Sequence, residues 1–375
     1  MSNRQGIYVK NLNGALSYKS FKPSLLPINP PIEIDNKILN TLNDAYSSIG
    51  KLNGIATKIP NINLFISMYI KKEALLSSQI EGTQCTLENI LNPNVDKNTN
   101  MDVKDVVNYI KAYEYSIEQL NKIPICSRLL KGAHKILLQN TRGEEKEPGS
   151  FRRSQNWLGG RGSTISNARY IPPNVDDMND ALNNLDNFIN EDKGNILINA
   201  ALIHYQFETI HPFLDGNGRI GRLLIVLYLI NKKVLDTPAL YVSYYLKNHR
   251  IEYYDRMTYV RETGNYEQWV QFFLEALLES CNDAITSINK MDDLHNKNIQ
   301  LINGSKKSIL KVFNYLEENP IIDIKRTAED LGLSYNTVSS AMNSLSGLGI
   351  LNSNNQMRNR VFYYNEFLDI LNSTI

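Results

Sequence analysis

The stretch HPFLDGNGRIGR, residues 211–222, decides how the rest of the chain is interpreted. It places a histidine, a carboxylate, an asparagine, three glycines and two arginines between apolar, helix-like segments. Each glycine costs a helix interior about 1 kcal/mol relative to alanine, so a plain core helix has no use for three of them. The glycines therefore indicate a backbone that bends and comes close to a ligand.

The glycine spacing also fits a dinucleotide-binding pattern, which we reject. Gly216, Gly218 and Gly221 match GxGxxG, and Asp236 lies about where a ribose-binding acid is expected. That pattern requires a strand directly before the first glycine, within a βαβ unit. The preceding segment ALIHYQFETI is helical instead, and the lysine–serine/threonine pair of a phosphate loop is missing. We therefore predict helix, anion-binding turn, helix.

The start of the second helix is the predicted phosphate site. Its first backbone N–H groups are unpaired and carry a partial positive charge, and Gly216 and Gly218 let them approach an anion. Arg219 and Arg222 are three residues apart, so they project from one helical face and match phosphate oxygens bidentately. These features together predict a polyphosphate ligand.

Two further side chains of the stretch suggest chemistry on that ligand. Asp215 would repel a phosphate unless a divalent cation lies between them, and Mg²⁺ accepts both carboxylate and phosphate oxygens. His211 lies four residues earlier and is one of only five histidines in the chain. We expect it to accept a proton from an attacking hydroxyl.

Helical periodicity dominates the chain from Glu33 onward, so we predict a mostly α fold. The sequence up to about Pro31 reads as irregular, and residues 149–173 read as a Gly-rich hairpin or loop. A polar break at 295–307 predicts a boundary. Beyond it, three short helices, with Gly332 between the second and third, and two strands around a polar turn predict a winged helix. Predicted helical segments before the break are 36–52, 62–80, 103–120, 127–139, 175–190, 195–210, 219–233, 242–264 and 266–288.

Residues 211–222 resemble the signature of the Fic family, His-x-Phe-x-Asp/Glu-Gly-Asn-Gly-Arg-x-x-Arg, and every fixed position matches. The resemblance covers roughly residues 30–285. It implies a Fic-type helical core with a short β-hairpin flap, to which the C-terminal winged-helix domain is appended. The expected division is an N-terminal helical region at 1–115, a catalytic core at 116–295 and the winged helix at 300–375.

The activity implied by this resemblance is transfer of AMP from ATP to a Ser, Thr or Tyr hydroxyl of a target protein. His211 would deprotonate the hydroxyl, Phe213 would anchor the turn in the core, and Asp215 would hold Mg²⁺ on the α- and β-phosphates. The flap from about Ser154 to Ala168 would pair with an extended target segment. The implied ATP-binding residues are Gly216, Asn217, Gly218, Arg219, Ile220, Gly221 and Arg222, with Arg222 nearest the γ-phosphate, and Tyr253 in the nucleoside pocket.

A second motif, SSQIEGT, lies upstream at residues 77–83. It resembles the inhibitory helix of the same family, with Ser77, Glu81 and Gly82 at the fixed positions. Gly82 reads as a helix stop, and a glutamate in the last turn faces the negative end of the helix dipole, so a nearby cation would favour it. The position of this motif before the catalytic one implies a self-inhibited, class II protein.

The composition limits the classes of function. The net charge of +1 gives no overall attraction to nucleic acid or membrane. Three dispersed cysteines, the lack of an apolar leader and a longest apolar run far below about 18 residues predict a cytoplasmic protein with no membrane partner.

Alternatives to AMP transfer to another protein remain open. The chain itself is a second potential target, and a Fic fold is also compatible with transfer of another phosphate-bearing group or with removal of AMP. A DNA-binding regulator is the competing class. However, the predicted recognition segment SYNTVSSAMNSLSG contains no lysine or arginine, although phosphate contacts require them.

Overall fold

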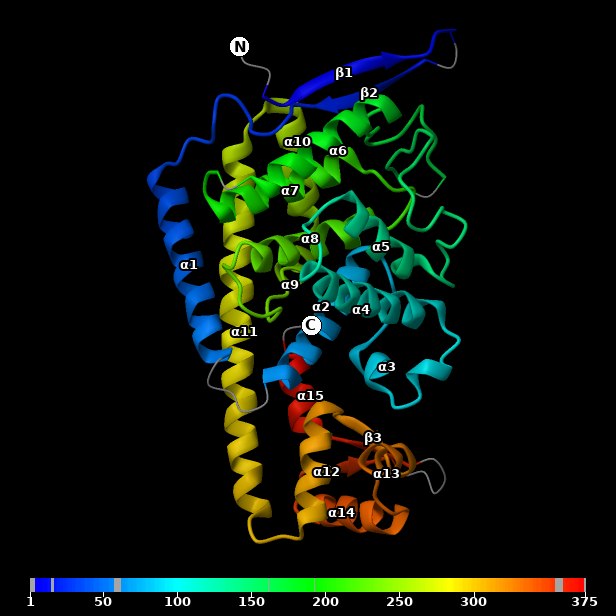
Figure 1. The fold of residues 1–375 in the computed structure, drawn as a ribbon, viewed down its shortest axis with the longest axis vertical. Helices are drawn as coiled ribbons and strands as arrows, with labels where there is room; N and C mark the ends of the chain where they lie inside the picture. The colour runs from blue at the N-terminus through cyan, green and yellow to red at the C-terminus, as the bar shows by residue number, and fades with distance from the viewer. Residues whose placement is uncertain are drawn as a thin grey trace.

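The computed structural model describes residues 4–14, 17–56, 62–160, 162–191, 193–354 and 360–373. The described chain is mostly helical, as predicted, and its helices stack around a central pair (Figure 1). The helices before the C-terminal region are α1 (Asn36–Ala56), α2 (Ile62–Ile80), α3 (Leu87–Leu91), the 3-10 turn η2 (Val95–Lys97), α4 (Met101–Leu120), α5 (Ser127–Leu138), α6 (Val175–Asn190), α7 (Ile196–Ile210), α8 (Asn217–Asn231), α9 (Ser243–Asn248), α10 (Arg250–Thr263) and α11 (Tyr266–Ile302).

The central pair is α7 and α8. Every α7 residue from Leu197 to Ile210 is buried, and the α8 side chains from Leu223 to Leu229 are at most 1% exposed. Helices that are buried on all sides form the centre of a core, and the polar side chains Glu208, Arg219 and Arg222 are buried with them. The turn between the two helices, residues 211–216, is therefore held by the best-packed part of the molecule.

The longest helix, α11, joins this core to the C-terminal region, and α1 packs along it (Figure 1). The helix α11 continues to Ile302, through most of the predicted polar break at 295–307, and the domain boundary placed there stays a prediction. Met291, Leu294, Asn298 and Ile302 are buried at helical spacing, whereas the polar residues between them are mostly on the exposed side. The helix α4 likewise runs through the boundary predicted between residues 115 and 116.

The N-terminal segment was expected to be irregular, and this expectation is wrong. Strands β1 (Gly6–Asn11) and β2 (Tyr18–Pro23) form an antiparallel hairpin at one end of the molecule (Figure 1). Phe21 is fully buried, and its N–H donates to the carbonyl of Ile171 at 2.9 Å. The strands are thus stabilised by a distant loop, a contact that no local sequence pattern reveals.

The hairpin predicted within 149–173 is reduced to a single bridge in the described residues. Leu158 and Tyr170 exchange backbone hydrogen bonds of 2.8 and 3.1 Å, and the rest of the segment is ordered turns. Arg161 lies outside the described residues. The chain enters α6 directly after this segment.

The C-terminal region contains the predicted helices α12 (Lys307–Glu318), α13 (Ile324–Leu331) and α14 (Tyr335–Gly347), and Gly332 ends α13 with φ of 63°. Strands β3 (Ile321–Asp323), β4 (Asn352–Ser353) and β5 (Val361–Tyr363) form a sheet of order β3-β5-β4. The sequence analysis missed β3 and the last helix, α15 (Asn365–Asn372). The predicted turn residues 355–359 lie outside the described residues, and the winged-helix assignment stays a prediction.

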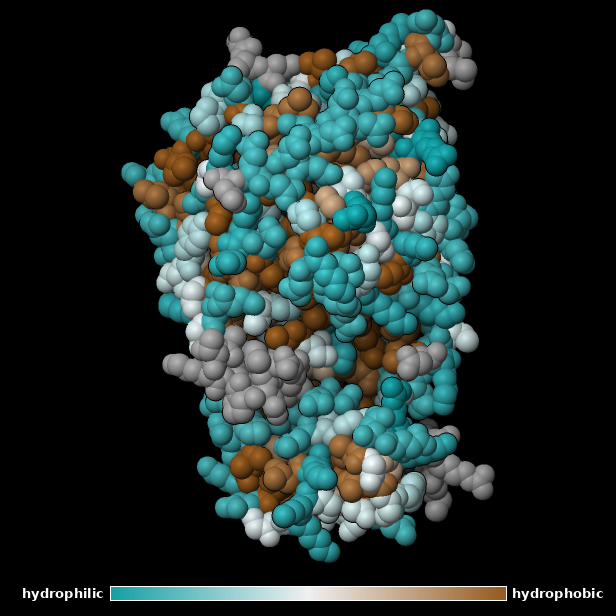
Figure 2. Space-filling model, in the orientation of Figure 1, coloured by the Kyte–Doolittle hydropathy of each residue, from teal (hydrophilic) through white to brown (hydrophobic). Residues whose placement is uncertain are grey.

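The surface gives no sign of a large apolar belt on the side that Figure 2 shows. That face is mostly hydrophilic, with apolar patches separated by polar side chains (Figure 2). Among the helices of the described residues, none is both long and apolar enough to cross a membrane.

Candidate active site

The turn between α7 and α8 is built from two left-handed residues and a side-chain clamp. His211 has φ of 50° and ψ of 61°, and Gly216 has φ of 76°. The Asn217 amide closes the turn, since its oxygen accepts from the N–H of Phe213 and its nitrogen donates to the carbonyl of Phe213, both at 2.8 Å. Phe213 is fully buried, so the turn is fixed to the core at its middle.

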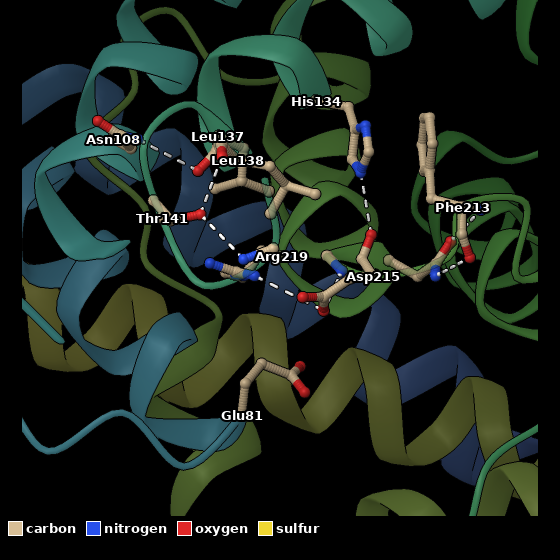
Figure 3. Close-up of polar contacts among 12 residues, drawn as sticks. Glu81, Asn108, His134, Leu137, Leu138, Thr141, Phe213, Asp215 and Arg219 are labelled. Atoms are coloured by element: carbon tan, nitrogen blue, oxygen red, sulfur yellow. Dashed lines mark hydrogen bonds and ion pairs between the residues drawn. The ribbon is translucent and has the colours of Figure 1, made fainter. Parts of the chain in front are cut away.

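His134 on α5 supports this turn from behind, and the sequence analysis did not identify it. Its ring stacks on Phe213 with centroids 3.8 Å apart. Nδ1 accepts from the N–H of Gly149 at 2.9 Å, so Nε2 carries the proton and donates to the carbonyl of Asp215 at 2.9 Å (Figure 3). Burial lowers the pKa of His134 to about 4, which keeps this neutral tautomer in place at neutral pH.

His211 is neutral and has one ring nitrogen turned toward the backbone. Burial lowers its pKa to about 4, so the imidazole is neutral at pH 7. Nδ1 lies 3.3 Å from the carbonyl of Glu208, which can only accept, so Nδ1 carries the proton. The lone pair of Nε2 is then left to accept a proton from a substrate.

The predicted phosphate-binding residues gather at the N-terminus of α8. Arg219 and Arg222 are 7% and 1% exposed, and the Asp215 carboxylate accepts from the N–H of Gly216 at 2.6 Å. Arg219 Nη2 lies 3.8 Å from Asp215 Oδ1 (Figure 3). Two buried cations and free helix N–H groups form a site suited to an anion.

The end of α2 lies against the same helix. Arg222 Nη2 donates to Glu81 Oε1 at 2.7 Å, and Arg222 Nε donates to Ser77 Oγ at 2.8 Å. A Cβ atom on Gly218 would lie 2.1 Å from Glu81 Oε1, so a glycine there allows the carboxylate to approach. Gly82 follows with φ of 96°. Burial opposes the charge on Glu81, but Arg222 outweighs it and lowers the pKa of the carboxyl.

A cavity of about 320 Å³ opens between residues 158–160 and α10. Glu208, Tyr254 and Arg261 line it, and the sequence analysis identified none of them. The predicted nucleoside residue, Tyr253, is fully buried and its hydroxyl lies 2.8 Å from His204 Nε2, so it faces the core beside the cavity. A wider depression on the outer side of α9 and α10 contains none of the predicted site residues.

The cavity contains an unusual carboxyl group. Glu208 is 8% exposed, and among the described residues its Oε1 has no hydrogen-bond partner. Burial raises the pKa of Glu208 to about 7. The same oxygen would lie 2.1 Å from a Cβ atom on Gly221, so the glycine allows the Glu208 carboxyl to pack against α8.

The residues around Asp215 suit a magnesium ion bound mainly through a ligand. The described residues contain no group of three or more His, Cys, Asp or Glu side chains that would hold a metal alone. Mg²⁺ usually takes one or two carboxylates together with phosphate oxygens and water. The Asp215 side chain is 47% exposed at the edge of the anion site, so it fits that role.

Comparison with known proteins agrees with this arrangement of fold and site. Residues 39–118 match the Fic/DOC family N-terminal region, and residues 124–229 match the Fic/DOC family domain. The chain is therefore a member of the Fic/DOC family, and the resemblance noted in its sequence is confirmed.

Its curated relatives are larger proteins. The protein adenylyltransferase Fic of Aedes aegypti is 32% identical over 132 residues, which are 34% of this chain and 23% of that protein. The protein of the same name from Drosophila melanogaster is 28% identical over 246 residues, 63% of this chain and 45% of the relative. The chain thus spans less than half the length of these relatives.

Solved structures share the fold at low sequence identity. A Fic family protein from Desulfovibrio desulfuricans G20 superimposes with a TM-score of 0.59 at 20% identity, covering 90% of this chain and 98% of that one. A Fic domain containing signaling protein from Bacteroides thetaiotaomicron gives a TM-score of 0.52 at 16% identity, covering 66% and 97%. The Fic-type fold predicted from the sequence is confirmed.

Proposed function

We propose that this protein is a protein adenylyltransferase that moves AMP from ATP to a Ser, Thr or Tyr hydroxyl of a target protein and is restrained by Glu81. The observation that supports this most directly is the juxtaposition of a neutral, half-buried His211 with an anion site at the start of α8. A base and a phosphate site joined by one rigid turn suit an attack on a bound phosphate.

The reaction breaks one P–O bond and forms another. The target oxygen attacks the α-phosphorus, the bond between the α-phosphorus and the bridging oxygen breaks, and pyrophosphate leaves. His211 Nε2 accepts the hydroxyl proton as the new bond forms. The left-handed conformation of His211 and the buried ring of Phe213 fix the base relative to α8 before substrate binds.

The triphosphate is held by the residues of the turn and of α8. The N–H groups of α8, with Arg219 and Arg222, bind the phosphate oxygens. Asp215 would hold Mg²⁺, which would neutralise phosphate charge. The cavity lined by Glu208 and Tyr254 takes the nucleoside, since Glu208 joins this cavity to α8 by packing against Gly221.

The restraint follows from what Glu81 touches. Its carboxylate lies against Arg222 and Gly218, where a terminal phosphate would otherwise bind. ATP then binds with its phosphates displaced, and the α-phosphorus is not aligned with the target oxygen. The segment from Ser154 to Ala168 borders the site and presents backbone groups to an extended target segment.

Intact-mass analysis after incubation with ATP and Mg²⁺ tests this function, on the parent chain and on the chain with Glu81→Gly. The expected result is a mass increase of one AMP group on the chain itself or on added cell proteins. ATP labelled at the α-phosphate should transfer its label, and ATP labelled at the γ-phosphate should not. Transfer of the γ-label would show phosphoryl transfer and overturn the proposal.

A further inference from the structure

The backbone around His211 is held by a segment that lies 55–60 residues earlier in the chain. Four consecutive carbonyls, those of residues 210–213, accept hydrogen bonds from Arg152 or Asn156. Arg152 donates to Ile210 at 3.4 Å and His211 at 3.1 Å from its side chain, and to Pro212 at 2.9 Å from its backbone N–H. The Asn156 amide donates to His211 at 3.2 Å and to Phe213 at 3.0 Å.

The carbonyls at a helix C-terminus have no partner within the helix and must find one elsewhere. Here they find side chains from a single short segment. The preceding carbonyl, that of Thr209, accepts from the hydroxyl of Tyr170 at 2.6 Å, and Tyr170 belongs to the same loop region. The end of α7 is therefore bound throughout to residues 152–170.

Arg152 is an unusual residue for a purely structural position. It is 1% exposed, and no carboxylate of the described residues forms an ion pair with it. The Arg152 side chain also donates hydrogen bonds to the carbonyls of Ser154 at 3.2 Å and Pro173 at 2.5 Å. A buried charge that lacks a counter-ion is costly, and the negative end of the α7 dipole offsets part of that cost.

We propose that Arg152, assisted by Asn156, is a positioning residue for His211, which fixes the left-handed backbone that aims the imidazole at the target hydroxyl. This inference rests on His211 being the base of the proposed function. A non-glycine residue at φ of 50° needs its surroundings to hold it there. The anion site at Arg219 and Arg222 has none of these contacts, so it should be independent of Arg152.

The charge of Arg152 adds a second effect. The charged groups that bear on His211 are Glu81 directly after α2, Asp215 from the turn and Arg152 itself, and the Glu208 carbonyl of α7 accepts from the His211 ring. Burial is the main cause of the low pKa of His211, and Arg152 lowers it further while the two carboxylates raise it. Removing the positive charge should therefore raise the pKa of His211.

The experiment compares Arg152→Gln, Arg152→Lys and Asn156→Ala with Arg153→Gln, a matched control at the exposed neighbouring arginine. Each is made in the parent and in the chain with Glu81→Gly. Arg152→Gln should lower kcat by roughly 10–10²-fold, since a displacement of about 1 Å can cost that much, with the KM for ATP changed by less than about twofold. Arg153→Gln should leave both unchanged.

Titration of the five histidines by NMR separates positioning from folding. Arg152→Gln should raise the pKa of His211, whereas Arg152→Lys should leave that pKa near its parental value and still lower kcat. Asn156→Ala leaves the buried charge in place, so it covers the case in which Arg152→Gln does not fold, and it should lower kcat without changing the KM for ATP.

Two results would overturn the positioning role: a kcat for folded Arg152→Gln and Asn156→Ala within about threefold of the Arg153→Gln control, or an unchanged His211 pKa in Arg152→Gln. Failure of the proposed function looks different. In that case His211→Ala would transfer AMP like the parent, or neither background would transfer it, while the histidine titration would still report whether Arg152 holds the ring.

Discussion

Arg222 Nη2 lies 2.7 Å from Glu81 Oε1, although the two residues are 141 positions apart in the chain. The arginine side chain is 1% exposed and the glutamate side chain 37% exposed, so the pair joins a buried cation to an accessible carboxylate. Ser77 contacts the same guanidinium through its hydroxyl and its carbonyl, at 2.8 and 2.9 Å. Arg222 is thus already occupied at the position where the anion site would need it free.

The first prediction is that Glu81→Gly increases AMP transfer. Removing the carboxylate frees Arg222 for a terminal phosphate and leaves the Ser77 contacts in place. If the restrained state is favoured by ~3 kcal/mol, its release is worth on the order of 10²-fold in transfer. The measurement is transfer of α-labelled AMP by parent and variant side by side, with Glu145→Gly at an exposed site as the control. Equal or lower transfer by a folded Glu81→Gly chain would leave Glu81 without an inhibitory role.

Arg222→Ala should not reproduce that gain. It breaks the same pair, but it also removes a phosphate-binding guanidinium from the core of the site. We therefore expect transfer at or below the parental level together with weaker ATP binding by calorimetry. A gain comparable to that of Glu81→Gly would show that Arg222 has no part in binding the nucleotide.

The second prediction is that His211→Ala loses transfer and keeps ATP. Removal of a general base typically costs roughly 10²–10⁴-fold in rate, whereas the phosphate-binding residues of α8 are untouched. Transfer rates and calorimetric ATP affinity are measured together, with His249→Ala as a control on a histidine outside the site. Parental transfer by a folded His211→Ala protein would remove His211 from the mechanism.

The third prediction concerns the metal. Asp215→Ala should weaken ATP binding in the presence of Mg²⁺ but leave it unchanged or strengthen it in excess chelator, because the carboxylate attracts phosphate only through the cation and repels it otherwise. Calorimetry with and without Mg²⁺ gives both values, and Asp180→Ala at an exposed site serves as the control. Undiminished transfer by the parent in excess chelator would show that the metal assignment is wrong.

The sequence predicted the centre of the site because its residues are nearly contiguous. His211 to Arg222 span one turn and the start of one helix, so local spacing is sufficient to place them together. Ser77 and Glu81 are also local to one helix end, although only the fold brings them to Arg222. The informative signals in the sequence were therefore the contiguous motif at residues 211–222 and the glutamate at an unfavourable helix C-terminus, Glu81.

The rest of the site could not be predicted from local pattern, since its contacts join distant segments. In the sequence, Arg152 is one of two adjacent arginines in a predicted loop. Only its burial against the end of α7 distinguishes it from the exposed Arg153. The protonation of His134 depends on the N–H of Gly149. Tyr254 rather than Tyr253 lines the cavity, because adjacent helical residues point in different directions.

The fourth prediction is that the C-terminal region binds DNA weakly at most, and only at low salt. The exposed face of α14 offers hydroxyl and amide groups, and its sequence YNTVSSAMNSLSG has no lysine or arginine to contact phosphates. Fluorescence anisotropy of the whole chain with random and genomic duplexes at increasing salt provides the measurement. Tight, sequence-selective binding through residues 300–375 at physiological salt would favour the regulator class instead.

The fifth prediction uses the unpaired carboxyl of Glu208. Its pKa is about 7 in the folded chain against a usual value of 4.5, so the folded state holds this proton more tightly than the unfolded state does. Glu208 therefore lowers the free energy of unfolding by up to about 3 kcal/mol as the pH rises from about 4.5 to 7. Above that range its contribution does not change further. The histidines His134, His204 and His211 have lowered pKa values and change the stability of the fold in the opposite direction.

A comparison with Glu208→Gln isolates the effect, since the amide has nearly the same shape and cannot ionise, while the histidine contributions are common to both proteins. The melting temperature of the variant minus that of the parent should increase by about 2 °C or more between pH 5 and pH 8 and stay constant above pH 8. Glu262→Gln, at an exposed position on α10, serves as the matched control. If the Glu208→Gln and parent curves run parallel across this range, Glu208 is not the titrating group.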